Sequence, residues 1–362
     1  MTENVMYTIG VDDIEDLALG AVVLGAGGGG DPHVAMLMLR QAIEKCGPVS
    51  VVHPDSLDPD AAVFPIAMVG APTVVVEKFP NGCEFEIVLR SLSQRLGVSP
   101  SAVVALESGG LNALFPLVVA AELGLPCVDS DGMRRAFPRL EQTLFTLGGV
   151  SSTPIAMADV YGNCVSFDCI DNAMSERFVR SSVTEMGMNA VIASYPMSGR
   201  QCADYGATGS LKYALELGRR IRAIRDGVPK ALKTFLDFAD AHVVFTGTVT
   251  DLIRNTTDGW ARAVATLEHL EDPTRLMTIQ IQNENLIAFE GDRAVVTVPD
   301  LISMIDIETA TPMTTESLRY GQRVHVLALP AAERWLLPDG LELAGPRAFG
   351  YNLDYVPFGV HA

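Results

Sequence analysis

Acidic side chains follow two β-prone runs of the sequence, and glycines stand beside them. Glu107–Gly110 (Glu-Ser-Gly-Gly) follows the run 102–106, and Asp129–Gly132 (Asp-Ser-Asp-Gly) ends the next run along the chain. Doubly wound sheets bind ligands at the carboxyl ends of their parallel strands. Carboxylates there can transfer protons or bind a metal ion, although aspartates in such loops also form Asx turns. We expect these loops to form a site, with Glu107 and Asp131 as candidate catalytic groups.

A glycine-rich segment follows the first helical pattern. Five of the six residues 25–30 are glycine, and Asp31 and Pro32 are typical of a helix start. Without side chains, backbone amides at a helix N-terminus can approach a ligand. The alternative is a tight corner between helices, which needs fewer glycines, so we expect a binding loop. The dinucleotide fingerprint Gly-x-Gly-x-x-Gly is present formally, but a helical pattern precedes it where a strand is required.

Three other kinds of side chain have two interpretations each. His33 is a candidate metal ligand or acid–base group, although a lone histidine in a first helical turn is more often merely polar. Arg200 follows a β-prone run and could hold a ligand carboxylate or pair with a surface acid. Cys164 and Cys169 could offer a nucleophile, but cysteines in β-prone runs are more often buried hydrophobic residues.

Strand and helix patterns alternate in the first part of the chain. Short β-prone runs at 49–52, 62–69, 102–106 and 126–129 are separated by helical patterns at 83–96 and 112–123. This alternation predicts an α/β N-terminal domain, residues 1–168, with a mainly parallel sheet. Short β-prone runs joined by turns follow from about residue 241, so residues 169–362 are expected to form a second, α+β domain.

Charge is distributed unevenly along the chain. The whole sequence of 362 residues has 44 acidic and 26 basic side chains, a net charge of −18. Such a surface repels phosphate backbones, so we expect no nucleic-acid partner. Residues 200–233 are basic, with 8 basic and 3 acidic side chains. We favour a solvated helix face that pairs with acidic parts of the chain over a docking surface for an acidic ligand or subunit.

The sequence also predicts a location. Residues 111–128 are the most apolar long stretch, but they contain Asn, Glu and two prolines, which a membrane span would not carry. The N-terminus has no secretory pattern, and six cysteines are too sparse for a disulfide framework. We therefore expect a cytoplasmic protein with a small-molecule substrate and no membrane partner, and we expect a homo-oligomer.

Several sequence blocks occur in the same order in one known family. They are Gly25–Pro32, Glu107–Gly110, Asp129–Met133 with Arg135–Pro138, and Gly345–Tyr351. Over nearly its whole length the chain resembles the family named for S-methyl thiohydantoin desulfurase. Members of that family are often described beside, or fused to, hydantoinase/oxoprolinase proteins. The resemblance implies an N-terminal α/β domain and a C-terminal domain with a β-rich swivelling module.

The family name implies removal of sulfur from C2 of a five-membered thiohydantoin ring by water, in hydantoin-related catabolism. Such a site needs a base to activate water and donors that face the anionic intermediate. We expect Glu107 or Asp131 to be the base, and the glycine-loop amides to meet a ring oxygen or a carboxylate tail. The residues expected to bind substrate are Gly27, Gly28, Gly29, Gly30, Asp31, Ser108, Asn112, Arg135 and Arg200.

Other interpretations of the site stay open. A divalent metal ion could replace the carboxylate base, with Asp129, Asp131 and His33 as ligands. The protein could instead be a non-catalytic accessory subunit of a hydantoinase/oxoprolinase assembly, with the glycine loop as an interface. A nucleotide-binding enzyme is the third alternative, but the match to the dinucleotide fingerprint is weak and we expect no nucleotide.

Overall fold

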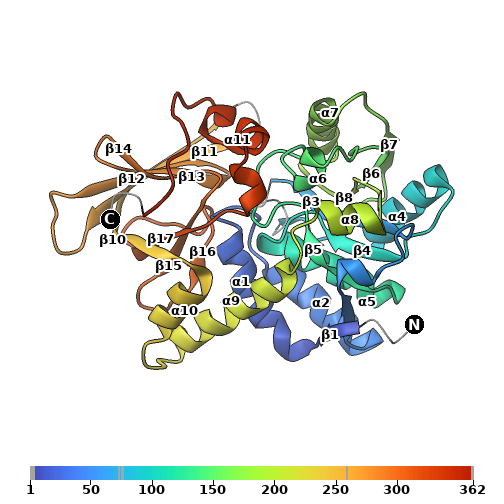
Figure 1. Cartoon of the computed structure of the whole chain (residues 1–362), viewed down its shortest axis with the longest axis horizontal. Helices are drawn as coiled ribbons and strands as arrows, with labels where there is room; N and C mark the ends of the chain where they lie inside the picture. The colour runs from blue at the N-terminus through green and yellow to red at the C-terminus, as the bar shows by residue number, and fades with distance from the viewer. Residues whose placement is uncertain (1–4, 72–73, 75–76, 258–259, 360–362) are drawn as a thin grey trace.

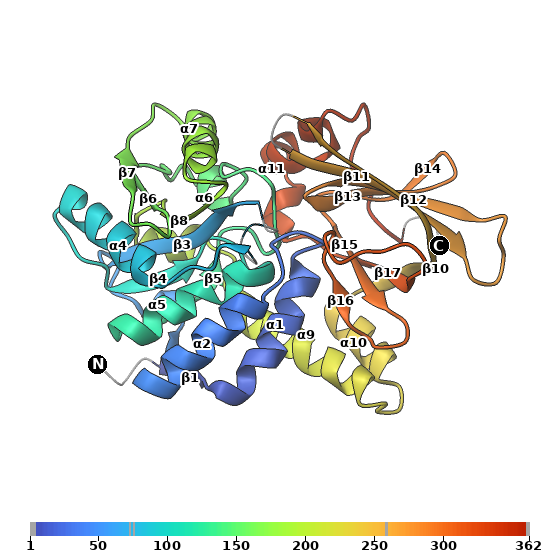
Figure 2. The same ribbon diagram turned by 180° about the vertical axis from the view of Figure 1, so that it is seen from behind.

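The structure, a computed structural model, describes residues 5–71, 74, 77–257 and 260–359. Two β-sheets organise these residues, and they lie side by side along the long axis of the molecule (Figures 1 and 2). Sheet A lies on the right in Figure 1 and sheet B on the left; α10 lies below sheet B, and α1 and α9 lie in the lower middle of the view.

Sheet A has the strand order β1-β2-β5-β4-β3-β8-β6-β7, and β9 also pairs with β3. The central strands β2, β5, β4 and β3 are parallel to one another, whereas the outer pairs are antiparallel. The strands are β1 (Val5–Ile9), β2 (Val49–Val52), β3 (Ala62–Gly70), β4 (Ala102–Ala105), β5 (Cys127–Asp131), β6 (Ile155–Ala158), β7 (Cys164–Phe167), β8 (Asn189–Ala193) and β9 (Met197–Ser198).

Both faces of sheet A are covered. Successive side chains of its central strands point into two different hydrophobic cores, one on each face. Val103 lies in the core that includes α2, α4 and α5, while its neighbour Val104 lies in the core that includes α7. Such double burial is typical of parallel strands. The helices are α1 (Ile14–Leu24), α2 (His33–Cys46), α4 (Cys83–Leu96), α5 (Phe115–Leu123), α6 (Leu144–Leu147), α7 (Asn172–Glu185), α8 (Gly199–Tyr205), α9 (Ser210–Arg225), α10 (Ala231–Ala239) and α11 (Pro338–Ala344).

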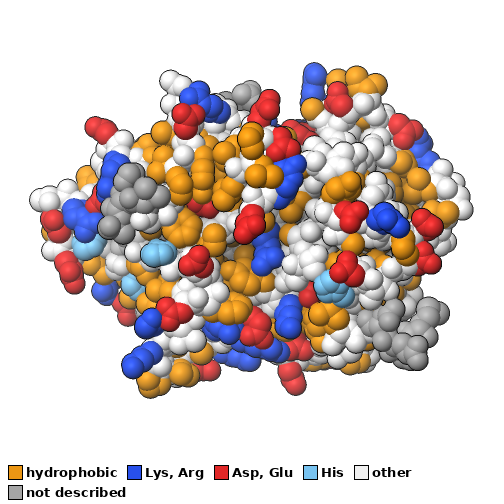
Figure 3. Space-filling model, viewed as in Figure 1, with side chains coloured by type: hydrophobic (Ala, Val, Ile, Leu, Met, Phe, Trp, Pro, Cys, Tyr) orange, Lys and Arg blue, Asp and Glu red, His pale blue; other side chains and the backbone are white. Residues whose placement is uncertain are grey.

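Helices α1 and α9 cross at very short range, and glycines allow this. A Cβ atom on Gly20 of α1 would lie 1.7 Å from the Ala214 carbonyl oxygen of α9, and one on Gly218 would lie 1.6 Å from that of Asp16. Arg222 of α9 donates to Asp16 at 2.6 Å, and Lys and Arg side chains over α9 stand among acidic ones (Figure 3). These contacts favour the interpretation of the basic segment as a face that pairs with acidic residues.

Sheet B is antiparallel throughout, with the order β14-β13-β12-β11-β10-β17-β15-β16. Its strands are β10 (His242–Thr257), β11 (Trp260–His269), β12 (Leu276–Gln282), β13 (Glu284–Glu290), β14 (Arg293–Thr297), β15 (Leu301–Asp306), β16 (Pro312–Met313) and β17 (Arg323–Leu329). Short 3-10 helices complete the fold: η1 (Val11–Asp13), η2 (Pro54–Ser56), η3 (Gly110–Ala113), η4 (Glu333–Leu336) and η5 (Pro346–Phe349).

The predicted α/β part and the β-rich later part are confirmed, whereas the swivelling of the later part stays a prediction. The boundary at residue 168 also stays a prediction. Strands β8 and β9 come after it in the sequence and still pair with β3 of sheet A. All six cysteines are free. None of the helices in the described ranges is both long and apolar enough to cross a bilayer.

Candidate functional site

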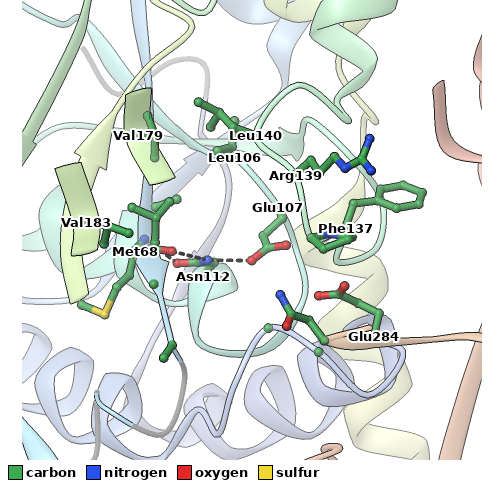
Figure 4. A pocket seen from close by; sticks show the side chains of 18 of the residues that line it. Met68, Leu106, Glu107, Asn112, Phe137, Arg139, Leu140, Val179, Val183 and Glu284 are labelled. Atoms are coloured by element: carbon green, nitrogen blue, oxygen red, sulfur yellow. Dashed lines mark hydrogen bonds between the residues drawn. The ribbon is translucent and has the colours of Figure 1, made fainter. Parts of the chain in front are cut away.

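A pocket with a volume of about 110 Å³, open to solvent, lies where the carboxyl ends of β3 and β4 face sheet B (Figure 4). Its walls are the end of β3, the loops that follow β4 and β5, the turn between β12 and β13, and one face of α7. The α7 wall consists of Glu176, Val179, Arg180 and Val183, whose spacing puts them on one side of the helix. The pocket is therefore at the end of the parallel strands where ligands of such sheets bind.

Glu107 occupies the centre of the pocket, directly after β4. Its side chain is buried although it lines the pocket. Burial raises the pKa of the Glu107 carboxyl to about 8, and the nearby charge of Asp131 acts in the same direction. A hydrogen bond from Asn112 opposes this shift because it stabilises the carboxylate. A carboxyl group with this pKa can hold or release a proton near neutral pH.

Asn112 fixes the position of that carboxyl group. Its amide nitrogen donates to Glu107 Oε1 at 2.6 Å and to the Met68 carbonyl at 3.1 Å, while its Oδ1 accepts from the Met68 amide at 2.7 Å. The side chain thus completes backbone hydrogen bonds at the end of β3 and points one N–H at Glu107 (Figure 4). Asn112 lies in η3, and from there its side chain contacts both the end of β3 and the residue Glu107 that follows β4.

Glu284, the first residue of β13, brings a second carboxyl group to the same pocket. It is 3% exposed, and its Oε2 has no hydrogen-bond partner within the described ranges. Burial and the Glu107 charge raise the pKa of Glu284 well above its usual value. Figure 4 shows the two carboxyl groups beside the same space. Sheet A and sheet B therefore contribute one acidic group each.

Arg135 is a buried cation beneath the pocket. It is fully buried, and its guanidinium donates to the carbonyls of Ala136, Pro299 and Asp300. Its Nη2 makes no hydrogen bond to the described residues. Burial lowers the pKa of Arg135 to about 10, while the charge of Glu284 raises it. The side chain is placed to neutralise buried carboxylates and does not line the pocket.

The glycine loop forms part of the pocket wall and joins the two sheets. Gly28 and Gly29 line the pocket. The Gly29 carbonyl accepts from the Leu111 amide at 3.0 Å, and the Gly27 carbonyl accepts from the Thr315 amide at 2.7 Å. A Cβ atom on Gly28 would lie 2.2 Å from Glu284 Oε1. The glycines are required here by close packing, and they also leave backbone exposed to the pocket.

Asp131 lies behind Glu107 and is fully engaged in holding the loops. Its carboxylate accepts from the amides of Ser108, Met133 and Arg134 at 2.8–3.1 Å, and from the Ser210 hydroxyl at 2.5 Å. It does not line the pocket. Ser108 is buried, and its hydroxyl has no partner within the described ranges. Of the two predicted catalytic carboxyl groups, Glu107 therefore faces the pocket, while Asp131 supports its loop.

The residues considered as metal ligands do not come together. Asp129 accepts from the Leu211 and Lys212 amides at the start of α9, and His33 is exposed on α2. Asp31 is exposed, and its Oδ1 accepts from the His33 amide as a helix cap does. No three His, Cys, Asp or Glu side chains are grouped to hold a metal ion within the ranges that the structure describes. These residues do not fit a preformed metal site.

Arg200 is exposed on α8 and does not line the pocket, so it is not placed to hold a ligand tail there. Arg139 and Arg180 line the pocket instead. Arg180 is paired with Glu176 at 2.6 Å, and Arg139 donates to the Ala348 carbonyl at 3.3 Å. These two side chains bring positive charge to a pocket wall that is otherwise partly apolar.

Family models match the chain in two consecutive parts. The model described as the S-Me-THD-like N-terminal domain matches residues 12–169, and that of the S-Me-THD-like C-terminal domain matches residues 170–358. The chain belongs to the S-methyl thiohydantoin desulfurase family. A thiohydantoin-related role is thereby supported at the level of the family, and the resemblance found in the sequence blocks is confirmed.

A crystal structure of a protein from Chromobacterium violaceum is similar in fold. The two share 28% sequence identity, and the match covers 97% of this chain and 99% of that chain with a TM-score of 0.80. No curated protein sequence matches the chain.

Sequence reasoning missed Glu284 and the α7 wall. Glu284 follows Asn283 in a polar turn between two β-prone runs, a context that usually indicates an exposed hairpin turn. Its burial depends on the approach of the glycine loop from far away in the sequence. The α7 wall could have been found from Val179 and Val183, which are apolar at helical spacing, but this pattern does not distinguish a pocket wall from a core face.

Proposed function

We propose that this protein hydrolyses the C2–sulfur bond of a thiohydantoin-type ring. The observation that carries the proposal is the Glu107 carboxyl group, buried in a pocket between the sheets with a pKa of about 8, in a chain of the thiohydantoin desulfurase family. A general base works best when its pKa lies near the working pH, and removal of a water proton needs such a base.

The reaction begins with water held between Glu107 and C2 of the ring. The Glu107 carboxylate takes a proton as the water oxygen attacks C2, and the electron pair of the C2–nitrogen double bond moves to the ring nitrogen. The C2–sulfur bond then breaks, sulfur leaves as a thiol, and C2 becomes a carbonyl carbon. Asn112 keeps Glu107 in place, because it is anchored to both backbone groups of Met68.

The pocket fits a small ring with one polar edge. Leu140, Val179 and Val183 supply apolar contacts from one side. The Gly29 amide on the other side donates no hydrogen bond within the described ranges, so it is available to a ring oxygen. Arg139 is the group that we assign to an anionic substituent. The product is a hydantoin, which places the reaction before a hydantoin-opening hydrolase.

The test is turnover of a panel of S-alkyl thiohydantoins and unsubstituted thiohydantoins, followed by detection of free thiol or sulfide and of the hydantoin. We expect Glu107→Gln to lower kcat/KM on the order of a hundredfold or more. Glu271→Gln is the matched control, because Glu271 is exposed in a turn of sheet B. A wild-type protein that releases no sulfur from any ring, but co-purifies with a hydantoinase, would support an accessory subunit instead.

A further inference from the structure

We propose that Glu284 is the general acid that protonates the departing sulfur, so that the catalytic pair is assembled from both sheets. This inference deepens the proposed function and rests on it. Glu284 is 177 residues from Glu107 along the chain and enters the pocket from the start of β13.

Glu284 is unusually buried for a carboxyl group at the start of a strand, beside a hairpin turn. Its carboxyl group is buried, with Oε1 against Gly28 and Oε2 without a hydrogen-bond partner in the described part of the chain. An unpaired buried polar atom is costly, and it persists where a ligand or a proton completes it. Glu284 also lines the pocket, and Figure 4 shows its carboxyl group beside the same space as that of Glu107.

The charges around the pair favour one shared proton. The charged groups that act on Glu284 are Glu107 after β4, Arg135 after β5 and Glu316 after β16. On Glu107 the acting charges include Asp131 and Arg135. Two carboxylates in a buried site cannot both ionise without a large penalty, and the Arg135 cation balances one of them. Near neutral pH, one carboxyl of the pair therefore keeps its proton.

The hydrogen bonds indicate which carboxyl group keeps it. Asn112 donates to Glu107, and the Phe137 backbone also stabilises the Glu107 carboxylate. The hydrogen bond that favours ionised Glu284 comes from its own backbone and the Arg135 charge acts in the same direction, but burial raises the pKa of Glu284 well above its usual value. Donors stabilise the ionised form, so Glu107 ionises first and Glu284 stays protonated. Glu107 is then the base and Glu284 the acid.

The proton balance of the reaction closes with this pair. Glu107 takes one proton from water as the oxygen–C2 bond forms, and passes it to the ring nitrogen that received the electron pair. As the C2–sulfur bond breaks, the sulfur takes its electron pair and the Glu284 proton, and the remaining hydroxyl proton goes to Glu107. Transfer of that proton from Glu107 to Glu284 restores the pair, and the net reaction consumes one water.

The test compares leaving groups of different basicity, an S-methyl and an S-(para-nitrophenyl) thiohydantoin. A basic alkylthiolate needs a proton to leave, whereas a nitrophenylthiolate does not. We expect Glu284→Gln to lower kcat on the order of a hundredfold or more for the S-methyl ring, and less than about tenfold for the nitrophenyl ring. Glu107→Gln is expected to slow both substrates alike, and Glu271→Gln to slow neither.

A second measurement uses the unmodified protein and does not depend on the folding of a variant. The rate for the S-methyl ring should fall at high pH, as Glu284 loses its proton, and this fall should be absent for the nitrophenyl ring. Equal losses of Glu284→Gln on both substrates, or identical pH profiles for both, would overturn the assignment of Glu284. If the wild-type protein releases thiol from neither ring, the proposed function itself fails and the role of Glu284 falls with it.

Discussion

Two opposing effects act on the proton of Glu107. Burial favours the neutral acid, while the Asn112 hydrogen bond favours the carboxylate, and burial has the larger effect on its pKa. The sequence could indicate Glu107 because an acid follows a β-prone run directly. It could not show that the oxygens of Asp131, at the end of the next strand, would accept hydrogen bonds from backbone amides. That outcome depends on the packing of three loops.

The raised pKa of Glu107 has a consequence for stability. A glutamate in an unfolded chain has a pKa near 4.5, whereas folded Glu107 has about 8. Between these pH values the folded state keeps a proton that the unfolded chain releases, so the free energy of unfolding falls as pH rises. Glu107→Gln lacks this contribution, and its thermal midpoint relative to wild type should therefore rise between about pH 5 and about pH 9.

Thermal unfolding followed by circular dichroism at several pH values checks this expectation. Glu271→Gln, whose carboxyl group is exposed, serves as the control and should follow the wild-type curve. An unchanged difference between Glu107→Gln and wild type over this range would show that Glu107 titrates normally.

At the scale of elements, the central strands could be predicted closely. The run 49–52 coincides with β2, and the predicted helix 83–96 coincides with α4. The local pattern was sufficient there, because the hydrophobic residues of each element recur at the spacing typical of its secondary structure. The place of β8 between β3 and β6, antiparallel to both, could not be predicted, since pairing partners depend on the path of the whole chain.

The glycine loop gives the prediction at this scale. Gly28 does not have a left-handed φ, so alanine is compatible with its backbone, but the new Cβ atom would lie 2.2 Å from Glu284 Oε1 and 2.6 Å from its Cγ. Gly28→Ala must displace Glu284, and we expect kcat to fall on the order of tenfold or more with a smaller effect on stability.

Gly10→Ala is the matched control. Gly10 also lacks a left-handed φ, and the nearest atom to its added Cβ would be 3.8 Å away. Kinetics and thermal midpoints of both variants provide the comparison. If Gly28→Ala unfolds the protein, or turns over at the wild-type rate, the loop does not position Glu284.

At the scale of the whole molecule, the pocket depends on the contact between the two sheets. The Ala26 carbonyl accepts from the Asn285 amide at 2.8 Å, and the Gly27 carbonyl accepts from the Thr315 amide at 2.7 Å. Sequence patterns predicted an α/β region and a later β-rich region. Such patterns are local, so they do not show which turn of one region contacts which loop of the other. For this reason the half of the site in sheet A was expected and the half in sheet B was not.

A bound product should therefore protect both halves together. We expect a hydantoin to slow backbone hydrogen exchange in residues 107–113 and in residues 283–286 at the same concentration. One bound ligand would contact both segments, because both line the same pocket. Exchange in the exposed turn around Glu271 is the internal control and should not change. Protection of only the first segment would place the ligand outside the junction.

The most direct test of the account is a reaction of an S-methyl thiohydantoin in isotopically labelled water. Mass spectrometry of the hydantoin and a thiol assay of the same sample measure both products. We expect labelled oxygen to enter at C2 in an amount equal to the methanethiol released. We expect Glu107→Gln to abolish both and Glu271→Gln to keep both. Thiol release without labelled oxygen, or undiminished turnover by Glu107→Gln, would contradict hydrolysis with Glu107 as the base.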